Sequence, residues 1–210
     1  MEVIAIEKFN NIPVEKQNVI INGALKAFGR NGYKKTSVSD IAEAAGISKS
    51  MVFHYFGTKR DLYFYLINFC GNLIMGEVQE KFDPGITDFF DRIIHTSRIE
   101  MAATKRYPAT MSFLTSFYLE DCEEVKADIQ AILTQGEEVR NQIALSGTDF
   151  SKFKEGVDIT LVMKMLMWIT DGFVNSTRNK DGLDYDSAYQ EIFDCLMLLK
   201  KSLYKEEYLN

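Results

Sequence analysis

Side chains that can bind a polyanion gather between residues 36 and 59 of this 210-residue chain. Ser37 and Ser48 each precede a short run with helical periodicity, so each can cap a helix whose free N–H groups and positive dipole attract phosphate. Lys49 and Ser50 follow at the start of the second run, where they can reach guanine acceptors or phosphate, and Met51 can contact a thymine methyl. The chemistry that this spacing indicates is contact with a DNA duplex.

Two short helices and a glycine turn must position these groups. Ser37 and Asp40 have the spacing of a capping box, and Gly46 stands where a helix end favours a left-handed residue. The first helix has one apolar face at spacings of three and four, made by Val38, Ile41, Ala42 and Ala45. The second helix begins after Ser48. Residues 37–56 therefore predict a helix-turn-helix, whose second helix enters the major groove.

Helices on both sides complete the predicted architecture. Pro13 suits the first turn of an upstream helix, and Thr58 with Asp61 repeats the capping-box pattern at the start of a long downstream helix. That helix must stop before the breaker pair Pro84-Gly85. With three prolines in the chain, an all-α fold is the natural expectation. We expect an N-terminal arm over residues 1–12, a three-helix DNA-binding domain over 13–60 and a C-terminal helical-bundle domain over 61–210.

This stretch resembles the DNA-binding domain of the TetR family of bacterial transcriptional regulators, and the resemblance covers about the first third of the chain. It rests on Ala27-Phe28, Gly32-Tyr33, Thr36, Asp40-Ile41-Ala42, Ala45-Gly46, Ile47-Ser48-Lys49, Phe53-His54-Tyr55-Phe56, Lys59 and Leu62. The DNA-binding residues that we expect from the motif and the resemblance are Thr36, Ser37, Ser48, Lys49, Ser50, Met51, Phe53, His54, Tyr55 and Lys59.

Each of these residues also has a plainer interpretation, and two depart from the family pattern. Thr36 can simply cap a helix, Lys59 can be a solvated lysine, and Tyr55 can pack in the core. Phe53 stands where the family commonly has a tyrosine whose hydroxyl reaches phosphate, and Met51 stands where a small hydroxyl residue is frequent. The base preference of the family therefore cannot be transferred to this chain.

The distribution of charge agrees with a DNA-facing N-terminus. Residues 1–60 hold nine Lys and Arg against five Asp and Glu, a net charge of +4. Residues 61–210 hold fifteen against twenty-five, a net of −10, and the two values give the total of −6. A basic end on an acidic body suits a protein that presents that end to a polyanion.

The last two helices are the most apolar part of the sequence. The resemblance implies that they meet a symmetry mate in a four-helix bundle, so that the protein is a homodimer; the alternative is that they only close the core of one chain. The resemblance also implies a small-molecule pocket in the C-terminal domain, although Met and aromatic residues at helical spacing are more often plain core. The pocket residues that we expect are Met101, Phe113, Phe117, Met165, Trp168 and Asn175.

We therefore expect a cytoplasmic, homodimeric repressor that binds a palindromic operator and is released by a small, apolar effector. One alternative is a helix-turn-helix regulator without an inducer, whose body only dimerises. A helical-bundle enzyme is a weaker alternative, because no catalytic motif, metal spacing or cofactor signature is present. Three widely separated cysteines indicate no disulfide framework, and no run of apolar residues is long enough to span a membrane.

Overall fold

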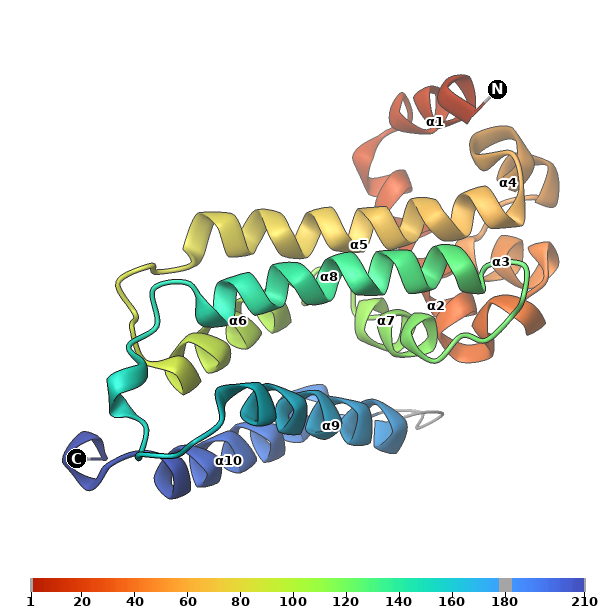
Figure 1. Ribbon diagram of the computed structural model, residues 1–210. Helices are drawn as coiled ribbons and strands as arrows, with labels where there is room; N and C mark the ends of the chain where they lie inside the picture. The colour runs from red at the N-terminus through yellow and green to blue at the C-terminus, as the bar shows by residue number, and fades with distance from the viewer. Residues whose placement is uncertain (1, 178–182, 210) are drawn as a thin grey trace. The chain divides into compact units, whose positions relative to one another are not determined.

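The computed structural model describes residues 2–177 and 183–209, with side chains from residue 6 onward (Figure 1). The described residues confirm the predicted all-α class, since they form helices linked by short connections and no β-sheet. The helices are α1 (Glu2–Asn10), α2 (Val14–Lys35), α3 (Val38–Ala45), α4 (Lys49–Phe56), α5 (Lys59–Lys81), α6 (Phe89–Thr104), α7 (Thr110–Tyr118), α8 (Lys126–Leu145), α9 (Ile159–Thr177) and α10 (Tyr185–Leu203), with 3₁₀ turns at η1 (Phe150–Lys152) and η2 (Glu206–Tyr208). Residues 2–10, which we expected to be an arm, are helical.

The chain divides into two compact units. The first unit contains Met1–Gly76 and Ala103–Ile132, and the second contains Glu77–Ala102 and Leu133–Asn210. The long helices α5 and α8 contribute residues to both units. A functional boundary at residue 60, as expected from the sequence, stays a prediction.

Close helix packing forms the helix-turn-helix part of the first unit. α2 packs against α3 at Gly23, where a Cβ atom would stand 2.5 Å from the Cα of Ala45. Only glycine permits this approach, because a side chain would overlap the facing backbone. α2 changes direction at Gly32, whose φ of 72° is in the left-handed region. The helix-turn-helix is therefore held against α2 by backbone contact.

Four aromatic side chains form the core behind this packing. Phe28 and Tyr33 come from α2, Tyr63 from α5 and Phe113 from α7, and each is at most 1% exposed. The Tyr63 ring lies 5.0 Å from Phe28, 4.9 Å from Tyr33 and 5.6 Å from Phe113, measured between centroids. Buried aromatic groups at these separations add edge-to-face attraction to a large apolar contact. Three helices of the first unit are thereby fixed to one another.

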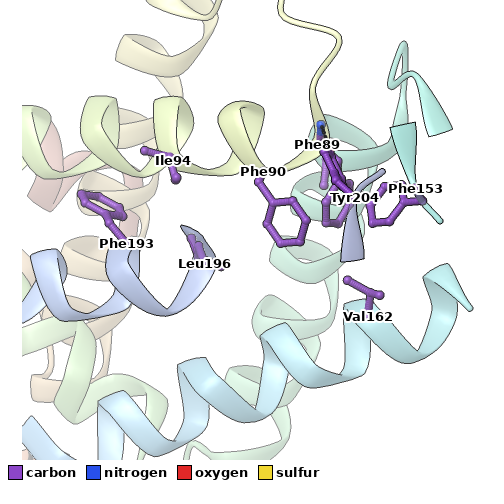
Figure 2. Close-up of a cluster of buried hydrophobic side chains, with 9 residues drawn as sticks. Phe89, Phe90, Ile94, Phe153, Val162, Phe193, Leu196 and Tyr204 are labelled. Carbon is purple, nitrogen blue, oxygen red and sulfur yellow. Dashed lines mark hydrogen bonds between the residues drawn. The ribbon is translucent and has the colours of Figure 1, made fainter. Parts of the chain in front are cut away.

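The second unit has its own aromatic core, which Figure 2 shows where α6 meets the end of α10. Its buried members are Phe89, Phe90, Ile94, Ala144, Phe153, Val162, Phe193, Leu196 and Tyr204. The hydroxyl of Tyr204 accepts a hydrogen bond from the Phe89 N–H at 3.2 Å. Because α9 contributes Val162 and α10 contributes Phe193 and Leu196, one face of each of these two helices is used inside the chain.

A buried carboxylate holds this core together. Asp88 is 7% exposed and lies within ion-pair distance of the Lys152 ammonium at 3.3 Å and the Lys200 ammonium at 3.2 Å. Burial alone would raise the pKa of Asp88, but the Asp91 N–H and the two ammonium groups outweigh it, so the pKa is lowered. Asp88 therefore remains charged and links the start of α6 to the end of α10.

Among the residues that the structure describes, no helix combines the length and the apolar composition needed to cross a bilayer.

Candidate nucleic-acid interface

The first helix of the helix-turn-helix starts and ends as its sequence predicts. The Ser37 hydroxyl accepts from the Asp40 N–H at 3.2 Å, and the Asp40 carboxylate accepts from the Ser37 N–H at 2.8 Å. Bonding to Ser37, first through its backbone, holds the pKa of Asp40 below its usual value. At the other end Gly46 has a φ of 64°, and its N–H donates to the carbonyls of Ala42 and Glu43. This reciprocal cap and the left-handed turn fix the angle at which α4 leaves α3.

α4, the candidate recognition helix, has one buried side and one exposed side. Val52, Tyr55 and Phe56 are buried. The exposed residues are Ser48, Lys49, Ser50, Phe53 and His54, with Met51 half-buried beside them. Phe53 keeps 51% of its surface exposed, although moving a phenylalanine side chain out of water is favourable. This exposed side of α4, with Ser37 at the start of α3, is the candidate DNA surface.

Two serine hydroxyls lie close together at the N-terminus of α4. The Ser48 hydroxyl caps the helix by accepting from the Met51 N–H at 3.3 Å, and it lies 2.8 Å from the Ser50 hydroxyl. Both side chains are exposed. Two hydroxyl groups thus stand at the positive end of a helix whose first residue is the exposed Lys49, and such groups bind phosphate oxygen.

Two of the expected DNA-binding residues are placed elsewhere. Thr36 is 1% exposed, and its hydroxyl donates to the carbonyls of Gly32 at 2.5 Å and Ala27 at 3.2 Å. It thus caps a carbonyl in the last turn of α2 and also reaches a carbonyl on the other side of the Gly32 kink. Tyr55 is 4% exposed, which corresponds to the packing alternative. The side chains of these two residues do not lie on the exposed side of the helix-turn-helix.

Lys59 stands in the first turn of α5, at the edge of the helix-turn-helix. Its ammonium donates to the Tyr33 carbonyl at 3.0 Å and lies 4.1 Å from the centroid of the Tyr33 ring. Thr58 and Asp61 cap this helix start, with the Thr58 N–H donating to the Asp61 carboxylate at 2.9 Å. An ammonium group has three N–H donors, so the bond to Tyr33 is compatible with a phosphate contact and restrains the side chain for it.

Some contacts that position the interface join residues far apart in the sequence. The Tyr33 N–H donates to the Glu120 carboxylate, and the Tyr33 hydroxyl donates to Glu124. Burial, and then the bond to Glu124, raise the pKa of Tyr33. Phe9 of α1 packs against α4 and α5. Glu120 is 87 residues from Tyr33, so no local pattern could have indicated this pair. The only signal for Phe9 is a large aromatic residue in a short segment that also holds several aliphatic residues.

The six residues expected to bind a ligand belong to different units. Phe113 and Phe117 are buried in the first unit. In the second unit, Met101 is half-buried against the aromatic core and Met165 is half-buried. Trp168 is 58% exposed, and the Asn175 side-chain amide donates to the Asp171 carbonyl at 2.8 Å. A pocket made by these residues stays a prediction.

Comparison with known proteins agrees with the geometry of the helix-turn-helix. Residues 20–66 match the model of the family described as bacterial regulatory proteins, tetR family. The fatty acid metabolism regulator protein of Bacillus subtilis (strain 168) is 23% identical over 163 residues, which are 75% of this chain and 80% of that protein. The HTH-type transcriptional repressor AcnR of Corynebacterium efficiens is 25% identical over 167 residues, 78% of this chain and 82% of its own. The first of these relatives is named as a regulator protein and the second as a transcriptional repressor, and neither is named as an enzyme.

The fold is shared with a solved structure over most of the chain. A TetR family transcriptional regulator from Chloroflexus aurantiacus J-10-FL superimposes with a TM-score of 0.70 at 19% identity, over 95% of this chain and 98% of that chain. At that identity the likeness concerns the fold. It extends the correspondence from the helix-turn-helix to the helices that follow it.

Proposed function

We propose that this chain, as a DNA-binding transcriptional regulator of the TetR family, acts as a homodimeric repressor. In this proposal a small, apolar ligand releases the dimer from a palindromic operator. The proposed DNA binding is supported chiefly by the exposed side of α4. Lys49, Ser50, Phe53 and His54 are solvent-exposed there, on a helix whose start is capped and whose other side is buried. A short helix presented in this way is suited to the major groove.

The dimer proposal rests on the outward sides of α9 and α10. Leu161 and Trp168 on α9 are 48% and 58% exposed, and Met197 and Leu198 on α10 are 38% and 66% exposed. The buried residues of the same helices already serve the core of the second unit. Large apolar side chains gathered on two neighbouring helices typically mark a protein interface. A second copy related by a two-fold axis would cover them with the same surface, forming a bundle of four helices.

A two-fold dimer determines the form of the operator. Two recognition helices related by a two-fold axis contact two half-sites about one DNA turn apart, or a multiple of it, so the operator is a palindrome. A ligand that binds more tightly to a dimer with unsuitable spacing shifts the population away from DNA. Regulation of this kind takes place where the chromosome is, so we place the protein in the cytoplasm.

The ligand class follows from the apolar candidates for the pocket and from one relative. Met101, Phe113, Phe117 and Met165 offer flexible or flat apolar surfaces. The Bacillus subtilis relative is named as a fatty acid metabolism regulator protein, which makes fatty acids the first compounds to test. Side chains of this kind are suited to binding elongated apolar molecules.

Electrophoretic mobility shift with the DNA upstream of the chain's own gene tests the proposal. We expect a complex of two chains per duplex that survives competition by unrelated DNA. Extraction of the purified protein with organic solvent, followed by mass spectrometry, should yield an apolar compound, and adding it back should dissociate the complex. A complex that no extracted compound and no fatty acid dissociates would favour a regulator whose body only dimerises.

A further inference from the structure

We propose that α1 is a brace for the recognition helix, and that Phe9 is its positioning residue. The proposal rests on the proposed DNA-binding function of α4. α1 precedes the residues that match the family model, which begin at residue 20, so that match assigns no role to it. Figure 1 shows α1 next to α4, and the two helices are among the main contacting pairs of the first unit.

Phe9 is the residue through which α1 reaches α4. Its side chain is 0% exposed, and its ring centroid lies 4.7 Å from Phe56 and 5.7 Å from Tyr55, both in the last turn of α4. It also lies 5.8 Å from Tyr65 of α5. One side chain thus joins the end of the recognition helix to the long helix that follows it.

This contact matters because α4 is too short to be stable alone. It has eight residues, whereas isolated helices shorter than about 12–15 residues are marginal in water. The orientation of α4 therefore depends on what its buried side touches. Val52 is buried on that side, and α3 is a neighbour of α4. Phe9 supplies an aromatic contact at the C-terminal turn, where α4 meets Gly57 at a φ of 80°.

The contact also reaches toward the DNA side. The Tyr55 ring stands edge-on to Phe9 at an interplanar angle of 65°, and edge-on to the exposed His54 ring at 5.5 Å and 62°. Because close-packed side chains transmit small displacements, a shift of Tyr55 would move the turn of α4 that presents Phe53 and His54.

α1 itself is attached at a defined angle. The Gln17 side-chain amide of α2 donates to the Asn10 carbonyl at 3.1 Å and to the Ile12 carbonyl at 2.8 Å. The first bond satisfies a carbonyl left open at the end of α1, and the second holds the connection between α1 and α2. Pro13 follows with a φ of −52° and leads directly into α2. The connection between α1 and α2 is therefore held by hydrogen bonds, so α1 has a defined position from which it can support α4.

The test compares Phe9→Ala with Phe113→Ala in the full-length chain. Both phenylalanines are 0% exposed and lie in the first unit, but the ring partners of Phe113 are Phe28 and Tyr63, away from α4. Hydrogen exchange of the α4 amides needs no DNA. We expect the α4 amides to exchange about tenfold faster in Phe9→Ala than in the wild type and at the wild-type rate in Phe113→Ala, where faster exchange should fall on α2 and α7 instead. Equal acceleration in both variants, or none in Phe9→Ala, would overturn the brace.

The second measurement is the ratio of operator to random-duplex affinity, normalised to the folded fraction. Phe9→Ala should lower this ratio by about tenfold, the order of one lost base contact, while Phe113→Ala leaves it unchanged. If Phe9→Ala does not fold, Phe9→Leu and Phe113→Leu replace the pair, with the same direction expected. A wild-type chain that does not prefer operator would refute the proposed function, and the exchange result would still decide the brace.

Discussion

Replacement of Trp168 by alanine should weaken the dimer without destabilising the single chain. Trp168 lies on α9 and keeps 58% of its surface exposed, so it contributes little to the core of its own chain. If the outward sides of α9 and α10 meet a second copy, each Trp168 leaves water on association. The expected result is a higher dissociation constant for the dimer with an unchanged helix content at low protein concentration.

The magnitude follows from the exposed surface. A tryptophan buries about 150–250 Å² in a protein, so its exposed portion here is on the order of 90–140 Å². At about 25 cal/mol per Å², burying that portion contributes roughly 2–3.5 kcal/mol for each copy. A two-fold interface buries the residue twice. Because alanine retains part of the contact and area overestimates affinity, we expect the dissociation constant to rise by about 100- to 1000-fold.

The sequence makes the assay simple, because Trp168 is the only tryptophan in the chain. In the wild-type protein, dilution through the dimer dissociation constant should shift its fluorescence emission to longer wavelength as the indole becomes hydrated. Sedimentation velocity over the same concentration range gives the mass directly, and it also applies to Trp168→Ala.

Phe150→Ala is the matched control, since Phe150 is also a large aromatic residue with 40% of its surface exposed, but it lies in η1. It should dimerise as the wild type does. The reasoning is refuted if Trp168→Ala sediments as a dimer with wild-type affinity, or if Phe150→Ala weakens the dimer equally.

Two further predictions concern charge. Lys59→Ala should reduce the slope of log affinity against log salt by about one unit, because one phosphate contact is lost. Lys126→Ala, on α8, should leave the slope unchanged. Equal slopes in the wild type and both variants would exclude the phosphate contact. The lowered pKa of Asp88 means that its stabilising contribution is fully present above the unfolded pKa of about 3.9 and is lost as pH falls through the folded pKa. The unfolding free energy should therefore fall in acid, and Asp88→Asn should reduce that fall while costing about 3 kcal/mol at neutral pH. Denaturant unfolding from pH 7 to 2 measures both effects, and an unchanged pH dependence in Asp88→Asn would contradict the assignment.

Local patterns in the sequence were sufficient for the helix-turn-helix. The capping box of Ser37 and Asp40 and the left-handed Gly46 depend on residues within a few positions of one another, so their chemistry can be inferred without a fold. The same holds for the end of α5 before the Pro84-Gly85 pair. Periodicity also identified α9 and α10 as apolar helices.

Burial and distant contacts could not be predicted in this way. Thr36 and Tyr55 fall within the family-like stretch, but their side chains are taken up by packing and backbone bonds that only the fold determines. The bond from Tyr33 to Glu120 and the ion pair between Asp88 and Lys200 join residues that share no local pattern. Similarly, Trp168 has the same helical spacing whether it lines a pocket or faces outward.

Selection of bound sequences from a random pool of duplexes tests the central claim most directly, because it reports both the partner and its symmetry. We predict enrichment of a palindrome whose half-sites lie about one helical turn apart, or a multiple of it. The complex should contain two chains for each pair of half-sites. Failure to enrich any sequence, or enrichment of a single half-site bound by one chain, would contradict the account.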